Sequence, residues 1–289
     1  MYRKLLQIGA VVVLANGLAA CDDAARSGSP SAPSELGPGT TSIQLAGTVS
    51  DAAWRPIAGA RVEVLDGPQA GLATTSDGNG EYRLSGRFDA TTQFRATKDG
   101  HAALTKPLPP ACTQCDPDWW IHFSLEALAP HANLEGNYSL TFIADSACTG
   151  LPDELRSRTY AATITRDSNE GAPANSSYIV AVSGAPLFAN YNSFAIGIAG
   201  DYLAAILGDF HGTPGISEQI APNTYLGFEG LAEATVQTPA VSTISASFNG
   251  AIDYCELKSA MDWSWGCTPD PVAHRRCESK NHQLILSRR

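Results

Sequence analysis

Hydrophobic and polar residues alternate along most of the chain after residue 42, in short segments interrupted by glycine, proline and asparagine. Alternation with a period of two is the pattern of a strand that buries one face. Strands are predicted over residues 43–49, 60–65, 72–75, 81–84, 93–98, 102–105 and 119–125. Seven short strands at this spacing predict an antiparallel β-sandwich over residues 42–128.

The alternating segments are longer after the Ala129-Pro130 pair, where a second region begins at residue 134. Their apolar positions begin with Tyr138, Leu140 and Phe142, and continue through segments that start at Tyr160, Tyr178, Phe194, Tyr202, Leu226, Ile244 and His282. Eight alternating strands without a convincing helix predict an up-and-down β-barrel over residues 134–289, and a jelly-roll sandwich is the alternative. The predicted fold class is therefore all-β.

The N-terminus has the layout of a secretory signal peptide, because Arg3 and Lys4 precede an apolar run over residues 5–15. The sequence Leu-Ala-Ala-Cys that ends at Cys21 resembles the bacterial lipobox, in which the cysteine becomes the lipidated first residue of the mature protein. The resemblance implies a signal peptide over residues 1–20 and a lipid-anchored protein of the bacterial cell envelope. Cleavage after Ala19 without lipidation is the alternative.

Residues 21–41 are rich in serine, proline and glycine. Such a composition cannot bury a hydrophobic core, so this segment is predicted to be a disordered tether.

Four motifs follow one another between residues 47 and 101: GTVSD at 47–51, PIAGARVEV at 56–64, TTSDG at 74–78, and FRA at 94–96 with DGH at 99–101. In this order they resemble the carboxypeptidase regulatory-like domain, over about residues 41–128. The resemblance implies a prealbumin-like sandwich that is not itself catalytic and that serves as an accessory or carbohydrate-binding module. The His-x-x-Glu motif of the metallocarboxypeptidase catalytic domain does not occur in this sequence.

Gly136-Asn137-Tyr138 and Arg288 resemble the lipocalin arrangement, in which an aromatic residue after Gly-x packs under an arginine of the final strand. This resemblance implies contact between Tyr138 and Arg288. It also implies a second possible function, the transport of an apolar small molecule inside the barrel.

Composition excludes some partners and indicates the compartment. A formal charge of −10 argues against nucleic-acid binding, which needs a basic surface, and leaves lipidation as the means of membrane attachment. Six cysteines remain besides Cys21, an even number that predicts up to three disulfides in an oxidising compartment. They are Cys112, Cys115, Cys148, Cys255, Cys267 and Cys277. We interpret the first two as a local structural disulfide rather than a redox or zinc motif.

In an up-and-down barrel, the connections after strands one, three, five and seven share one end. Here they are the long segments 145–157, 184–193, 208–223 and 255–281. Long loops on a rigid scaffold often form binding sites. The pattern therefore predicts a binding mouth with Phe210, His211, Trp263 and Trp265, in which the tryptophans contact a sugar ring or an apolar ligand. The alternative is that the tryptophans plug the end of the barrel.

Asp209, His211 and Glu218 could form an acid–base or metal cluster, but no catalytic, phosphate-binding or dinucleotide motif accompanies them. The leading hypothesis is a non-enzymatic recognition protein without a cofactor or metal, whose partner is a glycan or an apolar small molecule. A lipocalin-like carrier and a hydrolase that uses His211 are the alternatives. A barrel interior filled by side chains would favour surface recognition over the carrier.

Overall fold

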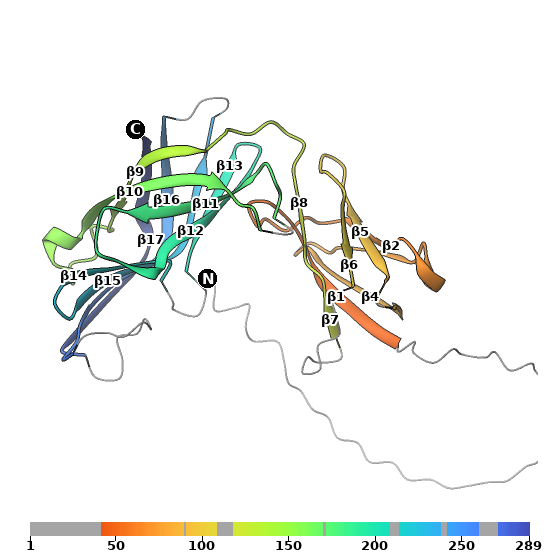
Figure 1. The fold of residues 1–289 in the computed structure, drawn as a ribbon, viewed down its shortest axis with the longest axis horizontal. Helices are drawn as coiled ribbons and strands as arrows, with labels where there is room; N and C mark the ends of the chain where they lie inside the picture. Colours follow the sequence, from red (N-terminus) through yellow and green to blue (C-terminus); the bar gives the residue numbers. More distant parts are fainter. Residues whose placement is uncertain are drawn as a thin grey trace, which may run out of the picture. The chain divides into compact units, whose positions relative to one another are not determined.

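The structure is a computed structural model that describes residues 42–89, 91–108, 118–169, 172–208, 214–237, 242–259 and 271–289. Regular structure in these residues is β-strand, apart from two short 3-10 segments, η2 (Gly67–Gln69) and η3 (Asp153–Leu155). Residues Gly39–Arg289 form one compact unit. Within the described ranges, no helix combines the length and apolar character that crossing a membrane requires. The predicted all-β class is confirmed (Figure 1).

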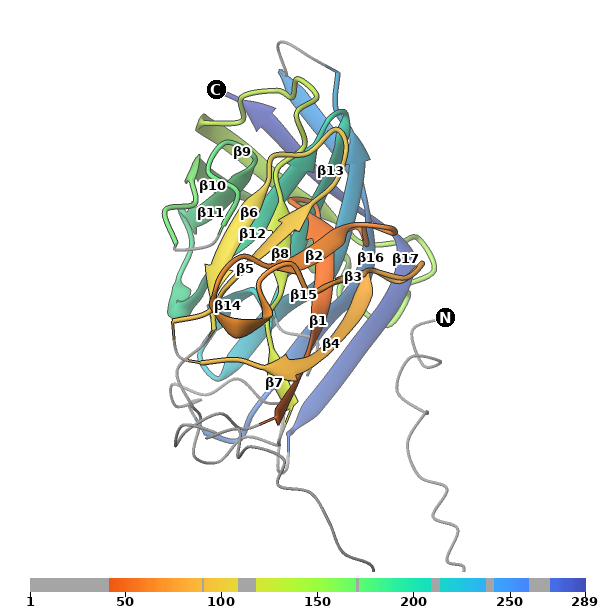
Figure 2. The ribbon, with the colours of Figure 1, turned by 90° about the vertical axis from the view of Figure 1, so that its right-hand side faces the viewer.

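The first half of the unit is a sandwich of two small sheets. One sheet contains β1 (Ser42–Asp51), β4 (Glu81–Arg87), β7 (Asp118–Trp120) and β8 (Phe123–Leu125), with β1 between β4 and the other two strands. The other sheet has the order β3 (Ala73–Thr75), β2 (Arg61–Val64), β5 (Gln93–Thr97) and β6 (Leu104–Pro107). Figure 2 shows β1 running alongside β4 and β7.

Alternation explains how each strand contributes to the sandwich core. In β4, Tyr82 and Leu84 are buried, whereas Glu81, Arg83 and Ser85 are exposed. They pack in one hydrophobic cluster with Val62 of β2, Phe94 of β5 and Phe123 of β8. The predicted sandwich is therefore confirmed, with its core between the two sheets.

The last predicted strand of the sandwich, residues 119–125, is instead two short strands, β7 and β8. Both pair with β1 in the parallel direction, so the sheet is mixed rather than wholly antiparallel. Between them the chain passes closely over Gly47, where a side chain would begin 1.8 Å from the carbonyl oxygen of Ile121. The Tyr82 hydroxyl donates a hydrogen bond of 2.7 Å to that oxygen. The chain reaches β1 from the opposite sheet, which explains how it can run parallel to β1.

The second half is a closed antiparallel barrel. Its strands are β9 (Gly136–Ile143), β10 (Ser157–Arg166), β11 (Ser177–Ser183), β12 (Leu187–Ala199), β13 (Tyr202–Leu207), β14 (Ile216–Ala221), β15 (Thr224–Thr235), β16 (Thr243–Glu256) and β17 (Ala273–Arg288). Each strand pairs with the next strand in sequence, except that β13 does not pair with β14. Strand β17 pairs with β9 and closes the ring. This topology confirms the up-and-down barrel and overturns the jelly-roll alternative.

Strands β13 and β14 occupy consecutive parts of one position in the barrel wall. Both lie between β12 and β15 and are antiparallel to them. The chain leaves the wall after Leu207 and returns at Ile216, so one long strand is interrupted by a detour. The prediction that residues 208–223 form a single end loop is therefore wrong.

The interior of the barrel is filled by side chains. Inward-facing residues of all the wall strands pack in one continuous hydrophobic cluster. At its centre, the rings of Phe142 and Phe228 are stacked with centroids 4.2 Å apart, and Phe248 and Tyr160 pack around them. The described interior residues thus form a packed core, as in other small barrels.

Candidate functional site

The structure changes the predicted binding mouth. The connection between β11 and β12 comprises only residues 184–186, and that between β14 and β15 only residues 222–223, with Asn223 at a φ of 59°. Residues 187–193 and 216–221 belong to the wall instead of to long loops, because they continue the hydrogen-bonded ladder. Only the β9–β10 and β16–β17 connections at this end are long.

Four side chains define the predicted binding mouth. Phe210, His211, Trp263 and Trp265 lie outside the described residues. Their convergence therefore stays a prediction.

Glu218, one member of the predicted acid–base cluster, belongs to the barrel interior. It is buried, Arg158 forms an ion pair with it, and the Tyr160 hydroxyl donates a hydrogen bond of 2.8 Å to its carboxylate. Burial and the adjacent carboxylate raise the pKa of Tyr160. These contacts engage Glu218 in an internal ion pair and leave it poorly placed to act on a substrate. Asp209 and His211 lie outside the described residues.

A second location emerges where a turn of the sandwich meets the outer wall of the barrel. The turn follows β1, and the buried carboxylate of Asp51 organises it. That carboxylate accepts hydrogen bonds from the backbone N–H groups of Ala53 (2.9 Å) and Arg55 (3.0 Å), and from Nε of Arg55 (2.7 Å). We call residues 51–55 the junction turn.

The junction turn packs closely on β12 and β13. A side chain at Gly197 would begin 1.8 Å from the carbonyl oxygen of Ala52, so only glycine allows this approach. The Arg55 guanidinium lies 4.4 Å from the centroid of the Tyr202 ring, a cation–π contact. The Tyr202 hydroxyl in turn donates to Glu233. Burial and the Glu233 carboxylate raise the pKa of Tyr202.

A cleft of about 370 Å³, which we call the junction cleft, opens beside the junction turn. Its lining residues include Trp54 of the turn and Tyr191, Ser193 and Ala195 of β12. Ser193 and Ala195 face outward, because they alternate with core residues such as Phe194. The cleft therefore lies on the outside of the barrel and has an aromatic residue from each half of the unit. Its volume falls in the range typical of small-molecule sites.

The detour between β13 and β14 forms another border of the cleft. Gly208, Pro214 and Gly215 line it there. Gly208 has a φ of 80°, and a side chain at Gly215 would begin 2.5 Å from the backbone nitrogen of Gly208. Glycine at both positions thus lets the chain leave and re-enter the wall within a narrow gap.

The conformation of Trp54 distinguishes it from the other lining residues. Its φ is 59°, in the left-handed region that residues other than glycine and asparagine rarely adopt. The residue is 41% exposed. The hydrogen bonds of Asp51 hold the flanking residues, and the Trp54 N–H donates to the Asp51 carbonyl at 3.0 Å. Such backbone strain is concentrated at functional sites. It points to Trp54 as a functional residue of the cleft.

Polar groups also line the cleft. Asn190 supplies an amide and Ser193 a hydroxyl, and none of the lining residues in the described part of the chain is acidic or basic. The arrangement suits an uncharged ligand with an apolar ring face and several hydroxyl groups.

The cysteines include one disulfide between described residues. Cys148, in the β9–β10 connection, is bonded to Cys277 of β17. Cys255 is also disulfide-bonded, and its partner is not among the described cysteines. Cys112, Cys115 and Cys267 lie outside the described residues, so their pairing stays a prediction.

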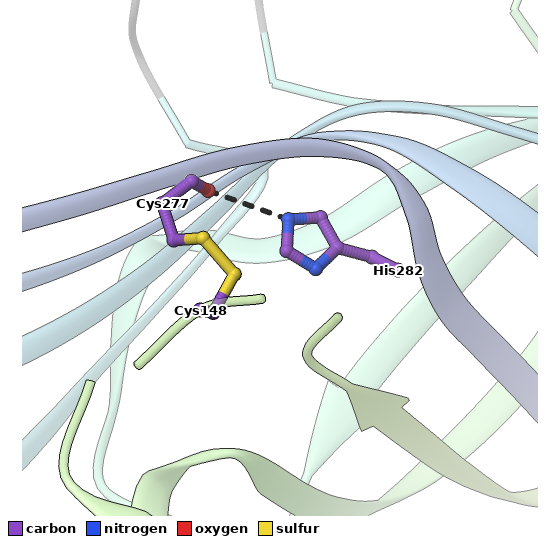
Figure 3. Close-up of side chains that lie close together, drawn as sticks. All are labelled: Cys148, Cys277 and His282. Carbon is purple, nitrogen blue, oxygen red and sulfur yellow. Dashed lines mark hydrogen bonds between the residues drawn. A yellow bond between two sulfur atoms is a disulfide. The ribbon is translucent and has the colours of Figure 1, made fainter. Parts of the chain in front are cut away.

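Buried His282 lies beside the Cys148–Cys277 disulfide, so three atoms of metal-ligating type come within 4.8 Å of one another (Figure 3). Both sulfurs are used by the disulfide, and Nδ1 of His282 accepts a hydrogen bond of 2.9 Å from the backbone N–H of Asp145. Burial lowers the pKa of His282. The group therefore fastens the β9–β10 connection to β17 and in this form has no thiolate to offer a metal.

Asp145 also holds the β9–β10 connection against β17. Its carboxylate accepts hydrogen bonds from the backbone N–H of Ala147 (3.0 Å) and from the side chains of Ser279 and Asn281. These bonds, that of Ala147 foremost, lower the pKa of Asp145 to about 2.

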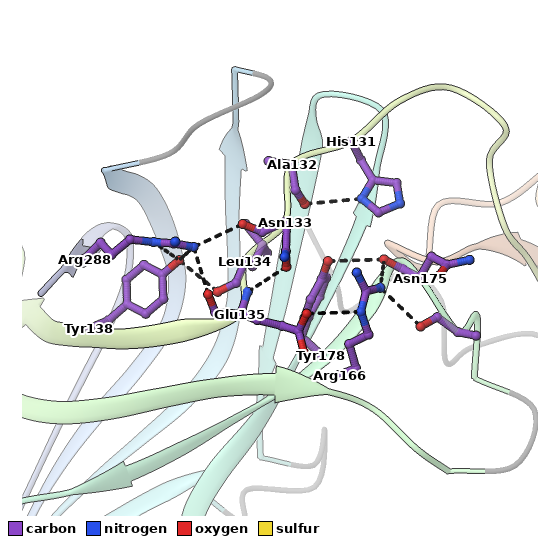
Figure 4. A network of polar contacts seen from close by, with 11 residues as sticks. His131, Ala132, Asn133, Leu134, Glu135, Tyr138, Arg166, Asn175, Tyr178 and Arg288 are labelled. Carbon is purple, nitrogen blue, oxygen red and sulfur yellow. Dashed lines mark hydrogen bonds and ion pairs between the residues drawn. The ribbon is translucent and has the colours of Figure 1, made fainter.

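The predicted contact between Tyr138 and Arg288 is present (Figure 4). The guanidinium carbon lies 5.3 Å from the ring centroid, and Nη2 donates to the Tyr138 hydroxyl (2.9 Å) and to the carbonyl oxygen of Glu135 (2.9 Å). Arg288 thereby joins the end of the chain to the segment that leads into β9. The contact does not by itself show kinship with lipocalins.

Sequence reasoning missed Trp54 and Tyr191. One signal was available for Trp54: a tryptophan in a turn, three residues after an aspartate that can cap the turn. Nothing in the sequence shows that Tyr191 lies near it, since the docking of the junction turn on β12 brings the two together.

Comparison with known proteins finds a family model that is similar to part of the chain. Residues 44–112 match the family model of the carboxypeptidase regulatory-like domain, within the segment where that resemblance is predicted. No curated protein matches the chain.

Two solved structures align over much of the chain. One is a protein from Bacteroides fragilis described as membrane-associated and of unknown function, with 9% identity, coverage of 86% of this chain and 98% of that chain, and a TM-score of 0.24. The other is the shaft pilin SpaA of Lactobacillus rhamnosus GG, with 10% identity, coverage of 83% and 95%, and a TM-score of 0.24. Similarity at this level says nothing about the function of this chain.

Proposed function

We propose that the protein is a non-catalytic recognition protein of the bacterial cell envelope that binds a carbohydrate in the junction cleft. The observation that carries this proposal is Trp54, a half-exposed indole that the Asp51 turn holds at the cleft in a strained conformation. An exposed indole face packs well against the apolar face of a sugar ring, because the C–H groups of that face meet the electron-rich π surface of the indole.

The remaining groups of the cleft suit the same ligand class. The Asn190 amide both donates and accepts hydrogen bonds, and the Ser193 hydroxyl does the same. Sugar hydroxyls need such paired donors and acceptors. The lack of charged side chains among the described lining residues favours a neutral sugar over a phosphorylated or acidic one.

The envelope location follows from the N-terminal sequence. The lipobox-like segment ending at Cys21 would attach the protein to a membrane through acyl chains, and residues 21–41 would act as the tether. The acidic net charge fits attachment through lipid rather than through basic side chains.

The alternative functions receive less support. A lipocalin-like carrier needs space inside the barrel, whereas the described interior side chains pack around stacked Phe142 and Phe228. A hydrolase that pairs His211 with Glu218 needs a carboxylate free to exchange protons, whereas Arg158 and Tyr160 both bind Glu218. Surface recognition makes no such demand on the interior.

A binding screen with two variants tests the proposal. The mature protein is titrated with a panel of neutral mono- and oligosaccharides by calorimetry. Trp54→Gly removes the ring and relieves the positive φ, so we expect it to lose at least tenfold in affinity while its unfolding midpoint does not fall. Trp54→Phe keeps an aromatic ring, and we expect it to retain part of the affinity.

Asn223→Gly is the matched control, because Asn223 is the other described non-glycine residue with a positive φ and lies in the β14–β15 turn. It should bind like the wild type. If Trp54→Gly binds every sugar as tightly as the wild type does, or if no sugar of the panel binds at all, the proposed function is wrong.

A further inference from the structure

A second exposed indole, Trp120, lies on the solvent-facing side of the sandwich. Trp120 is the last residue of β7, and its register places it opposite Ala46 of β1, which is in turn opposite Arg83 of β4. Leu45 and Leu84, the neighbours of Ala46 and Arg83 in sequence, enter the sandwich core. Alternation therefore turns Ala46, Arg83 and Trp120 to the outer face of the sheet, and 53% of Trp120 is exposed there.

The imidazole of His122 stacks beside this indole. Its ring is nearly parallel to that of Trp120, with an angle of 24° between the planes and 6.1 Å between the centroids. A hydrogen bond of 2.9 Å joins Nδ1 of His122 to the Thr48 hydroxyl and fixes the orientation of the imidazole. Lys106 Nζ donates to the His122 carbonyl oxygen at 2.8 Å and steadies the backbone.

The surroundings of His122 favour the neutral form of its imidazole. Burial, and then the positive charge of Lys106, lower the pKa of His122. A neutral imidazole offers one nitrogen that donates and one that accepts, a combination that matches a hydroxyl group.

The surroundings of Trp120 distinguish a sugar from a protein surface as its partner. Protein interfaces are built around a contiguous apolar centre with a polar rim. Here the side chains that share the outer face with the indole are polar, namely Thr48, Glu81 and Arg83, whereas Ala46 is buried. A single flat ring among hydrogen-bonding groups can hold one sugar ring and offers little apolar surface to a protein partner.

We propose that Trp120 and His122 form a second carbohydrate subsite, which takes a sugar ring of a longer glycan chain independently of the junction cleft. The indole face covers the apolar face of the ring, while the free imidazole nitrogen and the Thr48 hydroxyl bind its hydroxyl groups. The proposal takes its ligand class from the proposed function and adds a separate site on the carboxypeptidase regulatory-like segment. A protein with two such sites would hold a polysaccharide more strongly than either site does alone.

Native gel electrophoresis through soluble neutral polysaccharides tests this subsite. The mature protein is run in gels that contain a β-glucan, a galactomannan or a dextran, and its retardation is measured against polysaccharide concentration. We expect Trp54→Gly to remain retarded, with a reduced apparent affinity. Adding Trp120→Ala to Trp54→Gly should lower the remaining affinity at least tenfold, and adding Trp120→Tyr should preserve part of it.

Leu65→Ala in the Trp54→Gly background is the control, because Leu65 is another exposed hydrophobic residue of the sandwich. It should leave the retardation unchanged. His122→Ala in the same background should weaken retardation without removing the indole, which separates loss of the site from misfolding of a Trp120 variant.

The outcomes separate the two proposals. If Trp54→Gly alone abolishes retardation, the Trp120 subsite is wrong and the junction cleft stands. If Trp120→Ala lowers retardation and Trp54→Gly has no effect, the subsite stands and the cleft is wrong. If neither substitution changes retardation, or if no polysaccharide retards the wild type, both proposals fail.

Discussion

The carbonyl oxygen of Ala52 lies where a side chain on Gly197 would begin, only 1.8 Å from the position of a Cβ atom. This contact joins the junction turn of the sandwich to the outer wall of the barrel. It also positions Trp54, two residues further along the chain, at the cleft.

We therefore expect Gly197→Ala to displace the junction turn. Overpacking a close contact typically costs about 1–3 kcal/mol, so the free energy of unfolding should fall by that amount. Denaturant titration measures the loss, and sugar affinity should fall with it because Trp54 moves. Gly78→Ala is the control, since a side chain at Gly78 would meet nothing within 4 Å. Equal stability of the two variants would show that the contact is not tight.

The Cys148–Cys277 disulfide should stabilise the barrel more than a local disulfide does. It spans 129 residues of sequence, and closing a long loop removes more freedom from the unfolded chain. We expect replacement of both cysteines by alanine to cost about 2–5 kcal/mol in denaturant titrations. Replacing Cys112 and Cys115 together, which would open only a short loop, should cost less. A larger loss from that second pair would contradict the interpretation.

His282 should make the stability of the protein depend on pH. Burial holds its folded-state pKa below the ordinary value of 6.5. Well above pH 6.5 the imidazole is neutral in both the folded and the unfolded protein, so His282 does not reduce the free energy of unfolding there. As the pH falls below 6.5 towards the lowered folded pKa, the unfolded chain takes up a proton that the folded protein resists, and stability decreases.

Replacing His282 by glutamine should flatten this decrease between pH 6.5 and 5. Unfolding midpoints in urea, measured across that range, provide the test. His101→Gln is the control, because it replaces a histidine remote from the disulfide, beside the Asp99-Gly100 turn. An unchanged slope in the His282 variant would show that another group causes the dependence.

Much of this architecture is predictable from the sequence, because alternation reports which strands have one buried face. The pattern fails at β14, where Glu218 occupies an inward-facing position as the partner of Arg158. A charged residue at a core position looks like a loop residue in the sequence, so the predicted loop extends over a wall strand. The ion pair with Arg158 compensates the buried charge and so makes a strand compatible with Glu218 at this position.

The candidate site is less predictable than the fold. The cleft depends on the approach of Ala52 to Gly197, and a sequence does not reveal which glycine another segment will cover. The sequence shows a long connection with Trp263 and Trp265 between the last two strands. It does not show that Ser193 faces outward into a cleft, because that depends on how the barrel closes.

Lipidation of Cys21 predicts where the protein fractionates. Acyl chains hold a protein at a membrane far more strongly than an acidic surface can, so Cys21→Ala should move the protein from the membrane pellet to the soluble exported fraction or leave it unprocessed. Cell fractionation and immunoblotting measure this, with Cys112→Ser as the control that keeps Cys21. A Cys21→Ala protein that is still cleaved and still sediments with membranes would defeat the lipid-anchor hypothesis.

Fluorine NMR of protein labelled with 5-fluorotryptophan tests the central claim most directly. The five tryptophans give separate probes at positions 54, 119, 120, 263 and 265, and single Trp→Phe variants assign the signals. A sugar that binds in the junction cleft should shift the Trp54 signal and leave those of Trp263 and Trp265 unchanged. A bound sugar that shifts the Trp263 and Trp265 signals while that of Trp54 stays fixed would place recognition at the end of the barrel and contradict the account.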